Sequence, residues 1–368
     1  MNAFPATLEN TLSTMARWLR HPLLAPFNAV EDWDRLVSAL NPLWSLVGPR
    51  ARVVRVVDEA PDVKSLWLKP NRHFRGFQPG QHVLLELDVD GASHARCFSV
   101  SSAPRRDGLL RLTIKRKDDG PVSTAAHALQ PGQVVRLGQA CGQFAARGDH
   151  SSLLLVAAGS GITPMMSLLH AWADQGESRD IALLYCSRSP VEAIFETELR
   201  SLAGRIPGLR VHLHHTQESG RLDADAVSSL VPDWDERETL VCGPDGFMQV
   251  VESMHADSGL SDRLQSESFG RRAAVVDAQA TEHAIRIDNP EQAFTVLAGQ
   301  SLLEGAEAAG LRPRFGCRRG ICRTCQCRKR SGTVLNLLTG QVSGPGEELI
   351  QLCISTPLGG VELARQPT

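Results

Sequence analysis

The sequence contains no apolar run long enough to cross a lipid bilayer, so no transmembrane helix is expected. Neither sign of charge dominates, because the net charge is −2, and no basic residue occurs in the first ten positions, which argues against a secretory signal or a transit peptide. Internal repeats, low-complexity tracts and the Ser-His-Asp, His-Glu-x-x-His or paired-carboxylate constellations of acid-base catalysis are also absent. These absences predict a cytoplasmic protein, long enough at 368 residues for two or three domains.

Four of the nine cysteines form a spaced pattern near the end of the sequence. Four residues separate Cys317 from Cys322, two separate Cys322 from Cys325, and twenty-seven separate Cys325 from Cys353. This is the spacing of plant-type 2Fe-2S sites, in which one loop supplies three thiolates and a distant strand supplies the fourth. Glycines in the loop permit the backbone angles that point N–H groups at sulfur. The pattern therefore predicts a 2Fe-2S cluster held by these four cysteines.

Other uses of the cysteines are weaker alternatives. Cys317, Cys322, Cys325 and Cys327 could close a tetrahedral zinc site without Cys353. A disulfide framework is disfavoured, because the number of cysteines is odd and the chain is long enough to bury a proper core. We expect Cys327 to be a neighbour of the cluster rather than a ligand.

The stretch from Leu311 to Arg330 carries eight basic side chains and no acidic one. It could be a solvated basic face that raises the reduction potential of the cluster. It could also dock an acidic partner protein, or a substrate bearing phosphates, at the rim of the cluster. Nucleic-acid binding is not expected, because the basic residues surround redox ligands.

The pattern of apolar residues divides the chain into four segments and a linker. Residues 1–48 show apolar side chains at helical spacing and predict helices that pack on the next domain or rest peripherally on a membrane surface. Residues 49–148 show short alternating runs with Pro-Gly and Asp-Gly turns and predict an antiparallel β-barrel. Residues 149–270 predict a doubly wound α/β domain, residues 271–282 a linker, and residues 283–368 an α+β ferredoxin-like (β-grasp) domain.

A nucleotide site is indicated at the start of the α/β segment. An apolar strand is followed by a glycine turn and an apolar-periodic helix, so backbone amides at the helix start can cradle a pyrophosphate. The residues expected at this turn are Gly159, Gly161, Thr163 and Pro164.

The following strand ends without the acidic residue that usually binds the ribose 2′-hydroxyl of NAD. Ser187 and Arg188 at that strand end, with Arg221 as a second candidate cation, suit a 2′-phosphate. The sequence therefore favours NADPH over NADH, although an arginine in such a position can also be a plain surface residue.

Four further motifs resemble those of the ferredoxin-NADP reductase superfamily. They are Arg96-Cys97-Phe98-Ser99, Gly120-Pro121-Val122-Ser123, Cys242-Gly243-Pro244 and Glu267-Ser268-Phe269-Gly270. The resemblance implies a flavin, FAD rather than FMN, on the barrel and a nicotinamide on the α/β domain.

In the flavin motifs, the resemblance implies that Arg96 pairs with the flavin pyrophosphate and that Phe98 and Ser99 lie on the isoalloxazine. Ser123 would cap the pyrophosphate at a helix start. Phe98 stands where the superfamily usually has tyrosine, so stacking is kept while the hydrogen bond of the phenol is lost. The cofactor-binding set also includes Cys97, Gly120 and Val122.

In the nicotinamide motifs, the resemblance implies that Cys242 lies near the carbon that gives up hydride. Gly243 and Pro244 would let the nicotinamide approach the flavin closely. Glu267 would lie near the nicotinamide, and Ser99 is the implied proton-handling neighbour of the flavin. Ser99, Cys242 and Glu267 are thus the candidate catalytic residues.

The combined order resembles single-chain NADPH reductases that feed bacterial non-haem di-iron enzymes. The lead-in and the segments 329–336, 339–343 and 350–357 are similar to reductases paired with membrane fatty-acyl (stearoyl-CoA type) desaturases. The implied function is electron transfer from NADPH through FAD and the cluster to such a partner. Two alternatives are the reductase component of an aromatic-ring or CoA-thioester oxygenase, and a redox-sensing protein without turnover.

Overall fold

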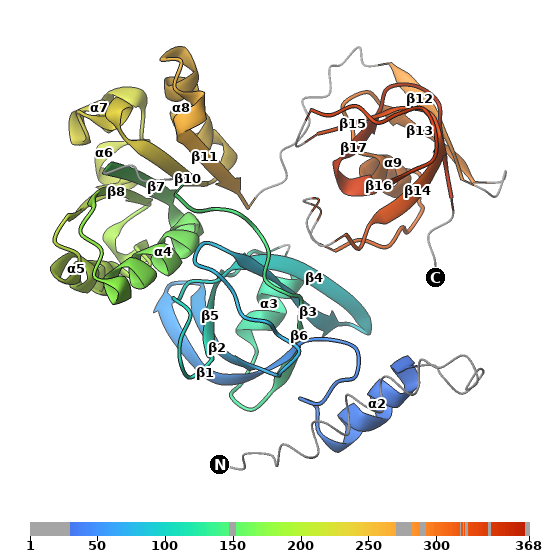
Figure 1. Cartoon of the computed structure of the whole chain (residues 1–368), viewed down its shortest axis with the longest axis horizontal. Coiled ribbons are helices and arrows are strands. Elements are labelled where there is room, and N and C mark those ends of the chain that lie inside the picture. Colours follow the sequence, from blue (N-terminus) through green and yellow to red (C-terminus); the bar gives the residue numbers. More distant parts are fainter. Residues whose placement is uncertain are drawn as a thin grey trace. The chain divides into compact units, whose positions relative to one another are not determined.

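The computed structural model describes residues 30–118, 120–146, 152–269, 281–287, 292–316, 318, 320, 323–337 and 340–364 (Figure 1). The chain divides into two compact units. The first contains the residues up to Gly243 together with Phe247–Glu267, and the second contains Pro244–Gly246 and the chain from Ser268 onward. Within the described ranges, no helix combines the length and the apolar character that crossing a membrane requires.

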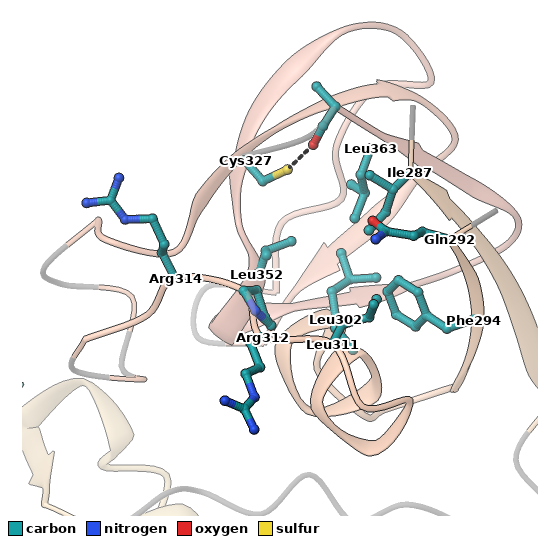
Figure 2. A pocket seen from close by; sticks show the side chains of 13 residues that line it. Ile287, Gln292, Phe294, Leu302, Leu311, Arg312, Arg314, Cys327, Leu352 and Leu363 are labelled. Carbon is teal, nitrogen blue, oxygen red and sulfur yellow. Dashed lines mark hydrogen bonds between the residues drawn. The ribbon is translucent and has the colours of Figure 1, made fainter. Parts of the chain in front are cut away.

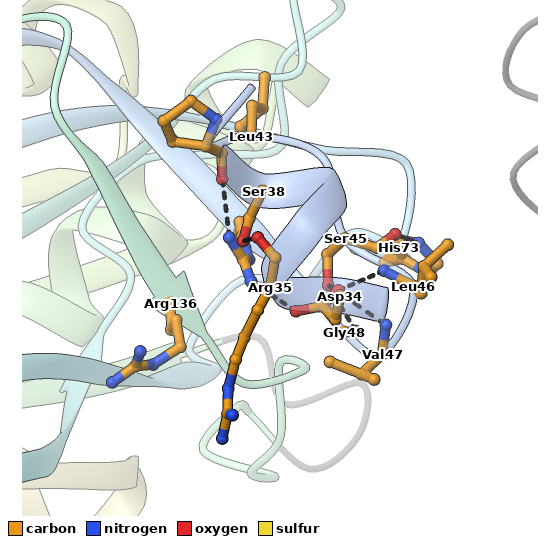
Figure 3. A network of polar contacts seen from close by, with 12 residues as sticks. Asp34, Arg35, Ser38, Leu43, Ser45, Leu46, Val47, Gly48, His73 and Arg136 are labelled. Atoms are coloured by element: carbon orange, nitrogen blue, oxygen red, sulfur yellow. Dashed lines mark hydrogen bonds and ion pairs between the residues drawn. The ribbon is translucent and has the colours of Figure 1, made fainter. Parts of the chain in front are cut away.

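Helix α2 (Val30–Leu40) precedes the first strand and is fixed by one buried carboxylate (Figure 3). Asp34 is 6% exposed and accepts hydrogen bonds from Ser45 Oγ at 2.9 Å and from a guanidinium nitrogen of Arg50 at 2.6 Å. His73 Nε2 lies 2.8 Å from the carbonyl oxygen of Ser45. These contacts hold the turn after α2 against the start of the barrel.

The helix expected in this part of the lead-in is present, but its apolar spacing does not correspond to a buried face. Val37 is buried, whereas Leu36 and Leu40 are 60% and 81% exposed. The part of the expected helical lead-in before Val30 lies outside the described residues.

The first strands form the predicted antiparallel barrel. Their order is β4-β3-β6-β1-β2-β5. A bridge between Val100 and Leu112 links the end of the fourth strand to the fifth and closes the sheet. The strands are β1 (Arg50–Ala60), β2 (Val63–Pro70), β3 (His82–Val89), β4 (Ala92–Ser99), β5 (Leu110–Lys115) and β6 (Val134–Leu137), with helix α3 (Pro121–His127) after β5. Alternating side chains such as Leu66, Leu85 and Leu112 are fully buried inside, which explains why these runs fold as strands.

The second half of the first unit is a parallel sheet with the order β11-β10-β7-β8-β9. Its strands are β7 (Ser152–Ala158), β8 (Asp180–Ser187), β9 (Leu209–His215), β10 (Glu238–Gly243) and β11 (Leu264–Ser268). Its helices are α4 (Ile162–Gln175), α5 (Glu196–Arg205), α6 (Thr216–Ser219), α7 (Ala224–Leu230) and α8 (Asp245–Asp257). Strand β7 pairs in parallel with both β8 and β10.

Helices cover both faces of this sheet, as the continuous apolar strands require. Helices α4 and α5 lie together on one face (Figure 1), and α7 and α8 pack on the other face through side chains such as Val227 and Met248. The strand order reverses at β7, which creates a crevice outside the carboxyl ends of β7 and β10. The doubly wound prediction is confirmed.

The second unit is a mixed sheet of order β13-β12-β18-β14-β16 with one helix packed on it and a separate β15-β17 pair. The elements are β12 (Glu282–Ile287), β13 (Ala293–Leu297), α9 (Leu302–Ala308), β14 (Gln326–Ser331), β15 (Val334–Asn336), β16 (Glu348–Gln351), β17 (Ser355–Pro357) and β18 (Val361–Leu363). The parallel β12 and β18 pair lies inside antiparallel neighbours, which is the predicted β-grasp arrangement. Ser301 and Glu304 form a capping box that starts α9.

Of the predicted linker, the structure describes only residues 281 and 282. Residues 271–280 lie outside the described ranges, and β12 begins at Glu282, which the sequence interpretation had placed in the linker. The other domain boundaries stay predictions.

Candidate functional site

The end of strand β4 places a buried hydroxyl at the expected flavin position. Ser99 is 3% exposed, and its Oγ has no hydrogen-bond partner among the described residues. Phe98 packs partly buried against the barrel core, and Arg96 Nη1 donates to the carbonyl oxygen of Ala95 at 2.8 Å. Cys97 is partly exposed. A buried hydroxyl normally has a partner, so the strand end fits a polar ring such as that of a flavin.

The turn before α3 uses the Ser123 side chain internally. Ser123 Oγ donates to the carbonyl oxygen of Gly120 at 2.9 Å and accepts from the Lys117 N–H at 3.1 Å. A Cβ on Gly120 would lie 2.4 Å from Ser123 Oγ, so the turn requires glycine. Val122 is buried in the barrel core. An anion at this helix start would therefore meet backbone N–H groups rather than the Ser123 hydroxyl.

At the base of the crevice, the backbone of the glycine turn after β7 lies very close to the backbone at the end of β10. A Cβ on Gly161 would lie 2.0 Å from the carbonyl oxygen of Cys242, so only glycine fits there. Gly159 has a φ of +53°, and Thr163 Oγ1 donates to the carbonyl oxygen of Ser160 at 2.9 Å. The turn thus starts α4 directly against the end of β10, which is the arrangement that a dinucleotide pyrophosphate needs.

The remaining nucleotide-motif residues surround this approach. Pro164 is buried in the first turn of α4, and Cys242 is fully buried. A Cβ on Gly243 would lie 2.8 Å from a ring carbon of Phe247, so this position is also crowded. Pro244 follows the end of β10 directly.

The end of β8 carries the residues expected at a 2′-phosphate. Ser187 Oγ donates to the carbonyl oxygen of Ser189 and lies 2.9 Å from His215 Nδ1, a neighbour that the sequence interpretation did not include. Arg188 is 69% exposed and lies 3.9 Å from Glu192, and Arg221 is exposed. The exposed side chains of Arg188 and Arg221 thus lie near this edge of the sheet, while the Ser187 hydroxyl already donates its hydrogen bond within the protein.

Glu267 belongs to a buried cluster that the sequence interpretation missed. Its Oε1 lies 3.2 Å from His82 Nδ1, and His82 Nε2 lies 3.4 Å from Cys141 Sγ. Burial lowers the pKa of His82, but hydrogen bonds to Cys141 and Glu267 and their charges outweigh it and raise the pKa to about 9. His82 is paired across β3 and β4 with Ser99, so the cluster lies beside the expected flavin position, on the same face of the sheet as Ser99.

In the second unit, two of the predicted cluster ligands converge. The sulfur atoms of Cys325 and Cys353 lie 3.2 Å apart, and both cysteines are free thiols. The N–H of Gly320 donates to Cys353 Sγ at 3.3 Å, as expected for a loop that directs amides at sulfur. Cys317 and Cys322 lie outside the described residues. Two converging thiols and an amide aimed at one of them fit an iron-sulfur cluster.

Cys327 lies in the core of the second unit (Figure 2). It is 4% exposed and donates its S–H to the carbonyl oxygen of Ala364 at 3.1 Å. It lines an apolar pocket of about 260 Å³ together with Phe294, Leu302 and Leu352. A carbonyl oxygen this close to the sulfur disfavours a negatively charged thiolate, so the ligand set without Cys327 stays the prediction.

The basic stretch is not one open face. Lys329 is fully buried, and Arg328 and Arg330 pair with Glu347 at 2.5 and 3.2 Å. Arg318 pairs with Glu307. Five arginines of the stretch are exposed among the described residues, namely Arg312, Arg314, Arg323 and the paired Arg328 and Arg330. The interpretation of the whole stretch as solvated is therefore wrong for Lys329.

Three family models match successive parts of the chain. They are an oxidoreductase FAD-binding domain over residues 50–145, an oxidoreductase NAD-binding domain over residues 155–253, and a 2Fe-2S iron-sulfur cluster binding domain over residues 285–358. The matches follow the barrel, the parallel sheet and the β-grasp unit.

Whole-length relatives carry the same order of domains. The chain is 35% identical to an NADPH oxidoreductase of Mycobacterium tuberculosis over 89% of this chain and 87% of the relative. It is 31% identical to the ferredoxin reductase component of a 3-ketosteroid-9-alpha-monooxygenase of Mycobacterium tuberculosis, over 83% of this chain and 92% of the relative. The fold is similar to that of phthalate dioxygenase reductase, with a TM-score of 0.57 and 22% identity over 86% of this chain and 97% of that one.

The expected chemistry class is confirmed by these matches. The protein is an NAD(P)H-dependent oxidoreductase with FAD and a 2Fe-2S cluster as cofactors. Because the three matched domains and their order agree with those of these relatives, the chain belongs to the ferredoxin-NADP reductase superfamily, among the flavin reductases with a C-terminal 2Fe-2S domain.

Proposed function

We propose that the protein oxidises NADPH and delivers the electrons to a partner di-iron enzyme, with a membrane fatty-acyl desaturase as the expected acceptor. The observation that carries the proposal is that one chain holds a nucleotide crevice, a flavin-binding strand end and a pair of converging thiols. FAD accepts a hydride and releases electrons singly to a 2Fe-2S cluster when both are bound.

The nucleotide crevice positions the donor. Gly161 lets the start of α4 touch the end of β10, so N–H groups of the turn point into the crevice and bind a pyrophosphate. Cys242 and Gly243 end β10 at the same place and hold the nicotinamide end of the dinucleotide. Arg188 and Arg221 bind the 2′-phosphate, which is why we propose NADPH as the donor.

The strand end at Ser99 orients the flavin and handles its proton. Arg96 pairs with the pyrophosphate, Phe98 stacks on the ring, and the Ser99 hydroxyl supplies the hydrogen bond for which no described residue is a partner. Beside Ser99, His82 holds a proton between Cys141 and Glu267. The side chains of the chain thus bind and orient the cofactors, and no general base is required for the electron transfers themselves.

The cluster loop holds sulfur in a polar backbone setting. Cys325 and Cys353, with Cys317 and Cys322, are the proposed ligands. The Gly320 N–H donates to Cys353 Sγ, and Gln351 Nε2 donates to the Gly320 carbonyl oxygen at 2.7 Å, so Gly320 is held through both of its backbone polar groups. Such N–H donors stabilise the negative charge on the sulfur atoms.

The second candidate acceptor is an oxygenase. It is favoured by the names of the relatives, which include a reductase component of a 3-ketosteroid-9-alpha-monooxygenase and a reductase subunit of a glycine betaine monooxygenase from Chromohalobacter salexigens. The desaturase proposal rests instead on the likeness of the lead-in and tail segments. In both cases we propose that the acceptor docks near the rim of the cluster, at the exposed Arg312, Arg314 and Arg323.

A visible spectrum of the purified protein, before and after anaerobic addition of NADPH, tests the electron path. Bleaching of both the flavin and the iron-sulfur bands is expected, and a spectrum that NADPH leaves unchanged would contradict the proposal. Electron delivery to a purified desaturase and to a purified oxygenase component, measured side by side with equal reductase, then separates the two acceptors.

A further inference from the structure

Three reactive side chains from distant parts of the sequence meet beside the end of strand β4. Cys141 follows β6, His82 begins β3, and Glu267 lies in β11. Cys141 Sγ lies 3.4 Å from His82 Nε2, and His82 Nδ1 lies 3.2 Å from Glu267 Oε1. The order thiol, imidazole, carboxylate is the one in which an imidazole, held by a carboxylate, activates a nucleophilic sulfur.

The backbone fixes this arrangement before any ligand binds. The N–H groups of His82 and Cys141 each donate to the carbonyl oxygen of the other residue at 3.0 Å. A Cβ on Gly142 would lie 2.9 Å from His82 Nδ1, so glycine is needed beside the imidazole. Gln265 Nε2 donates to the carbonyl oxygen of Ala145 at 2.6 Å and ties β11 to the same segment. The thiol and the imidazole are therefore positioned by several independent contacts.

The charges around His82 favour its protonated form. The groups whose hydrogen bonds and charges raise its pKa are Cys141, from the segment after β6, and Glu267, from β11. Ser99, which faces His82 from β4, carries no charge. Together these contacts keep an imidazolium at neutral pH, since the pKa of His82 lies near 9. An imidazolium within hydrogen-bond distance of sulfur stabilises the thiolate over the thiol.

We propose that Cys141 is a reactive thiol that peroxide and small electrophiles modify, with His82 as the partner that activates it and Glu267 as the residue that positions His82. Cys141 is partly exposed, so a small reagent can reach it. By contrast, Cys186 and Cys242 are buried, and burial raises the pKa of the Cys186 thiol to about 12. The inference goes beyond electron transfer and does not depend on which acceptor the protein serves.

The reaction with hydrogen peroxide balances within the cluster. The Cys141 thiolate attacks one peroxide oxygen, an S–O bond forms as the O–O bond breaks, and the sulfur is oxidised while the peroxide is reduced. The leaving hydroxide takes the proton from His82 Nε2 and departs as water. Cys141 becomes a sulfenic acid, and His82 becomes neutral and loses its ion pair with Glu267. Oxidation at Cys141 would therefore loosen a contact directly beside Ser99.

The first test is the pH profile of Cys141 alkylation in the purified holoprotein. Iodoacetamide is added at pH values from 6.5 to 8.5, and peptide mass spectrometry follows Cys141, with Cys97 and added glutathione as references. An ordinary thiol gains about 50-fold in rate over this range, whereas Cys141 should change by less than about 5-fold. The shape of the profile is informative even if access slows the absolute rate. A profile parallel to that of glutathione, or no alkylation at any pH, overturns the proposal.

The second test removes the partner. His82→Gln should restore the steep rise with pH and slow the alkylation of Cys141 at pH 6.5 by about 10-fold or more. His127→Gln is the matched control, because His127 lies in the same barrel and its Nε2 contacts the Ile114 carbonyl oxygen, away from Cys141. An unchanged Cys141 profile in His82→Gln refutes the role of His82. If that variant does not fold, Glu267→Gln should give a Cys141 pH profile that is steeper than in the wild type and shallower than that of glutathione.

The third test uses the oxidant itself. Low-micromolar hydrogen peroxide followed by dimedone should label Cys141 in the wild-type protein, and the label should fall by about 10-fold in His82→Gln. Equal dimedone labelling of Cys141 and Cys97 would contradict selective oxidation at this site.

Discussion

Arg111 of strand β5 and Glu198 of helix α5 form an ion pair between the barrel and the parallel sheet, with Nη1 2.9 Å from Oε2. The other carboxylate oxygen of Glu198 lies 2.5 Å from His170 Nε2, and the Arg111 guanidinium lies over the ring of Phe195. Ser167 Oγ adds a hydrogen bond to the Ser102 carbonyl oxygen at 2.8 Å. These contacts join the two halves of the first unit.

Glu198→Gln should therefore destabilise the first unit by about 1–3 kcal/mol at pH 7. Burial raises the pKa of Glu198, but hydrogen bonds from His170 and Arg111 outweigh it and lower the pKa to about 2. The stabilisation is therefore present above pH 4.5 and is lost as the pH falls toward 2. Urea unfolding of both proteins at several pH values measures this, and a gap that stays constant down to pH 3 would contradict the role of the pair.

Gly161→Ala should abolish tight nucleotide binding. The new Cβ would lie 2.0 Å from the Cys242 carbonyl oxygen, so the turn must move away from β10. We expect the Kd for NADPH to rise by about 10-fold or more, because the N–H groups of the turn lose their alignment. Gly204→Ala, in α5 with open space around it, is the control and should bind NADPH normally. Nucleotide titration by fluorescence measures both.

Arg188→Ala and Arg221→Ala should each shift the donor preference toward NADH. Each removes a charged partner of the proposed 2′-phosphate, which is worth about 1–3 kcal/mol. The ratio of kcat/KM for NADPH to that for NADH should fall by about 10-fold. Arg200→Ala, another exposed arginine that pairs with Glu196, should leave the ratio unchanged. Equal ratios in all four proteins would remove Arg188 and Arg221 from the site.

Stability should depend on pH through His82. Because its pKa is raised from 6.5 to about 9, the stabilisation is complete below pH 6.5 and is lost as the pH rises through 9. The loss should be on the order of 2–3 kcal/mol. Thermal melting between pH 6 and 9.5 should show this decline in the wild type, and a flatter curve in His82→Gln. Parallel curves would show that the ion pair contributes little to stability.

Cys325→Ser and Cys353→Ser should lose bound iron, whereas Cys327→Ala should keep it. The first two variants remove the converging thiols, whereas the Cys327 thiol donates a hydrogen bond to the carbonyl oxygen of Ala364. Iron and sulfide analysis with the visible spectrum measures the difference, and the Cys327 variant should lose about 1–2 kcal/mol in stability from its core position. Loss of iron in the Cys327 variant would return this residue to the ligand set.

The sequence was sufficient for the fold because the relevant signals are local. The apolar run at 153–158, its glycine turn and the alternating barrel strands carry their own periodicity. The Cys325 and Cys353 assignment likewise follows from spacing. The contact of Gly161 with Cys242 was not predicted, because it depends on the order of the strands in the sheet.

Other features depend on register and packing that no local pattern encodes. His82, Cys141 and Glu267 are far apart in the sequence, and they meet only because β3 pairs with the segment after β6. Leu36 and Leu40 have helical spacing but lie exposed, since Asp34 rather than the apolar side chains fixes α2. The ion pair of Arg111 with Glu198 has no sequence signature.

Lys329 also gives the second unit a property that its surface arginines cannot provide. Its Nζ donates to the carbonyl oxygens of Gly332, Gly344 and Gly346 at 2.5 to 2.9 Å, and three acceptors require the three hydrogens of an ammonium. This cation lies in the interior on the strand that begins next to Cys325, where dissolved ions do not screen it. The contribution of this cation to the reduction potential of the cluster should therefore persist in concentrated salt. The attraction that we propose between the exposed arginines and an acidic acceptor should instead be screened.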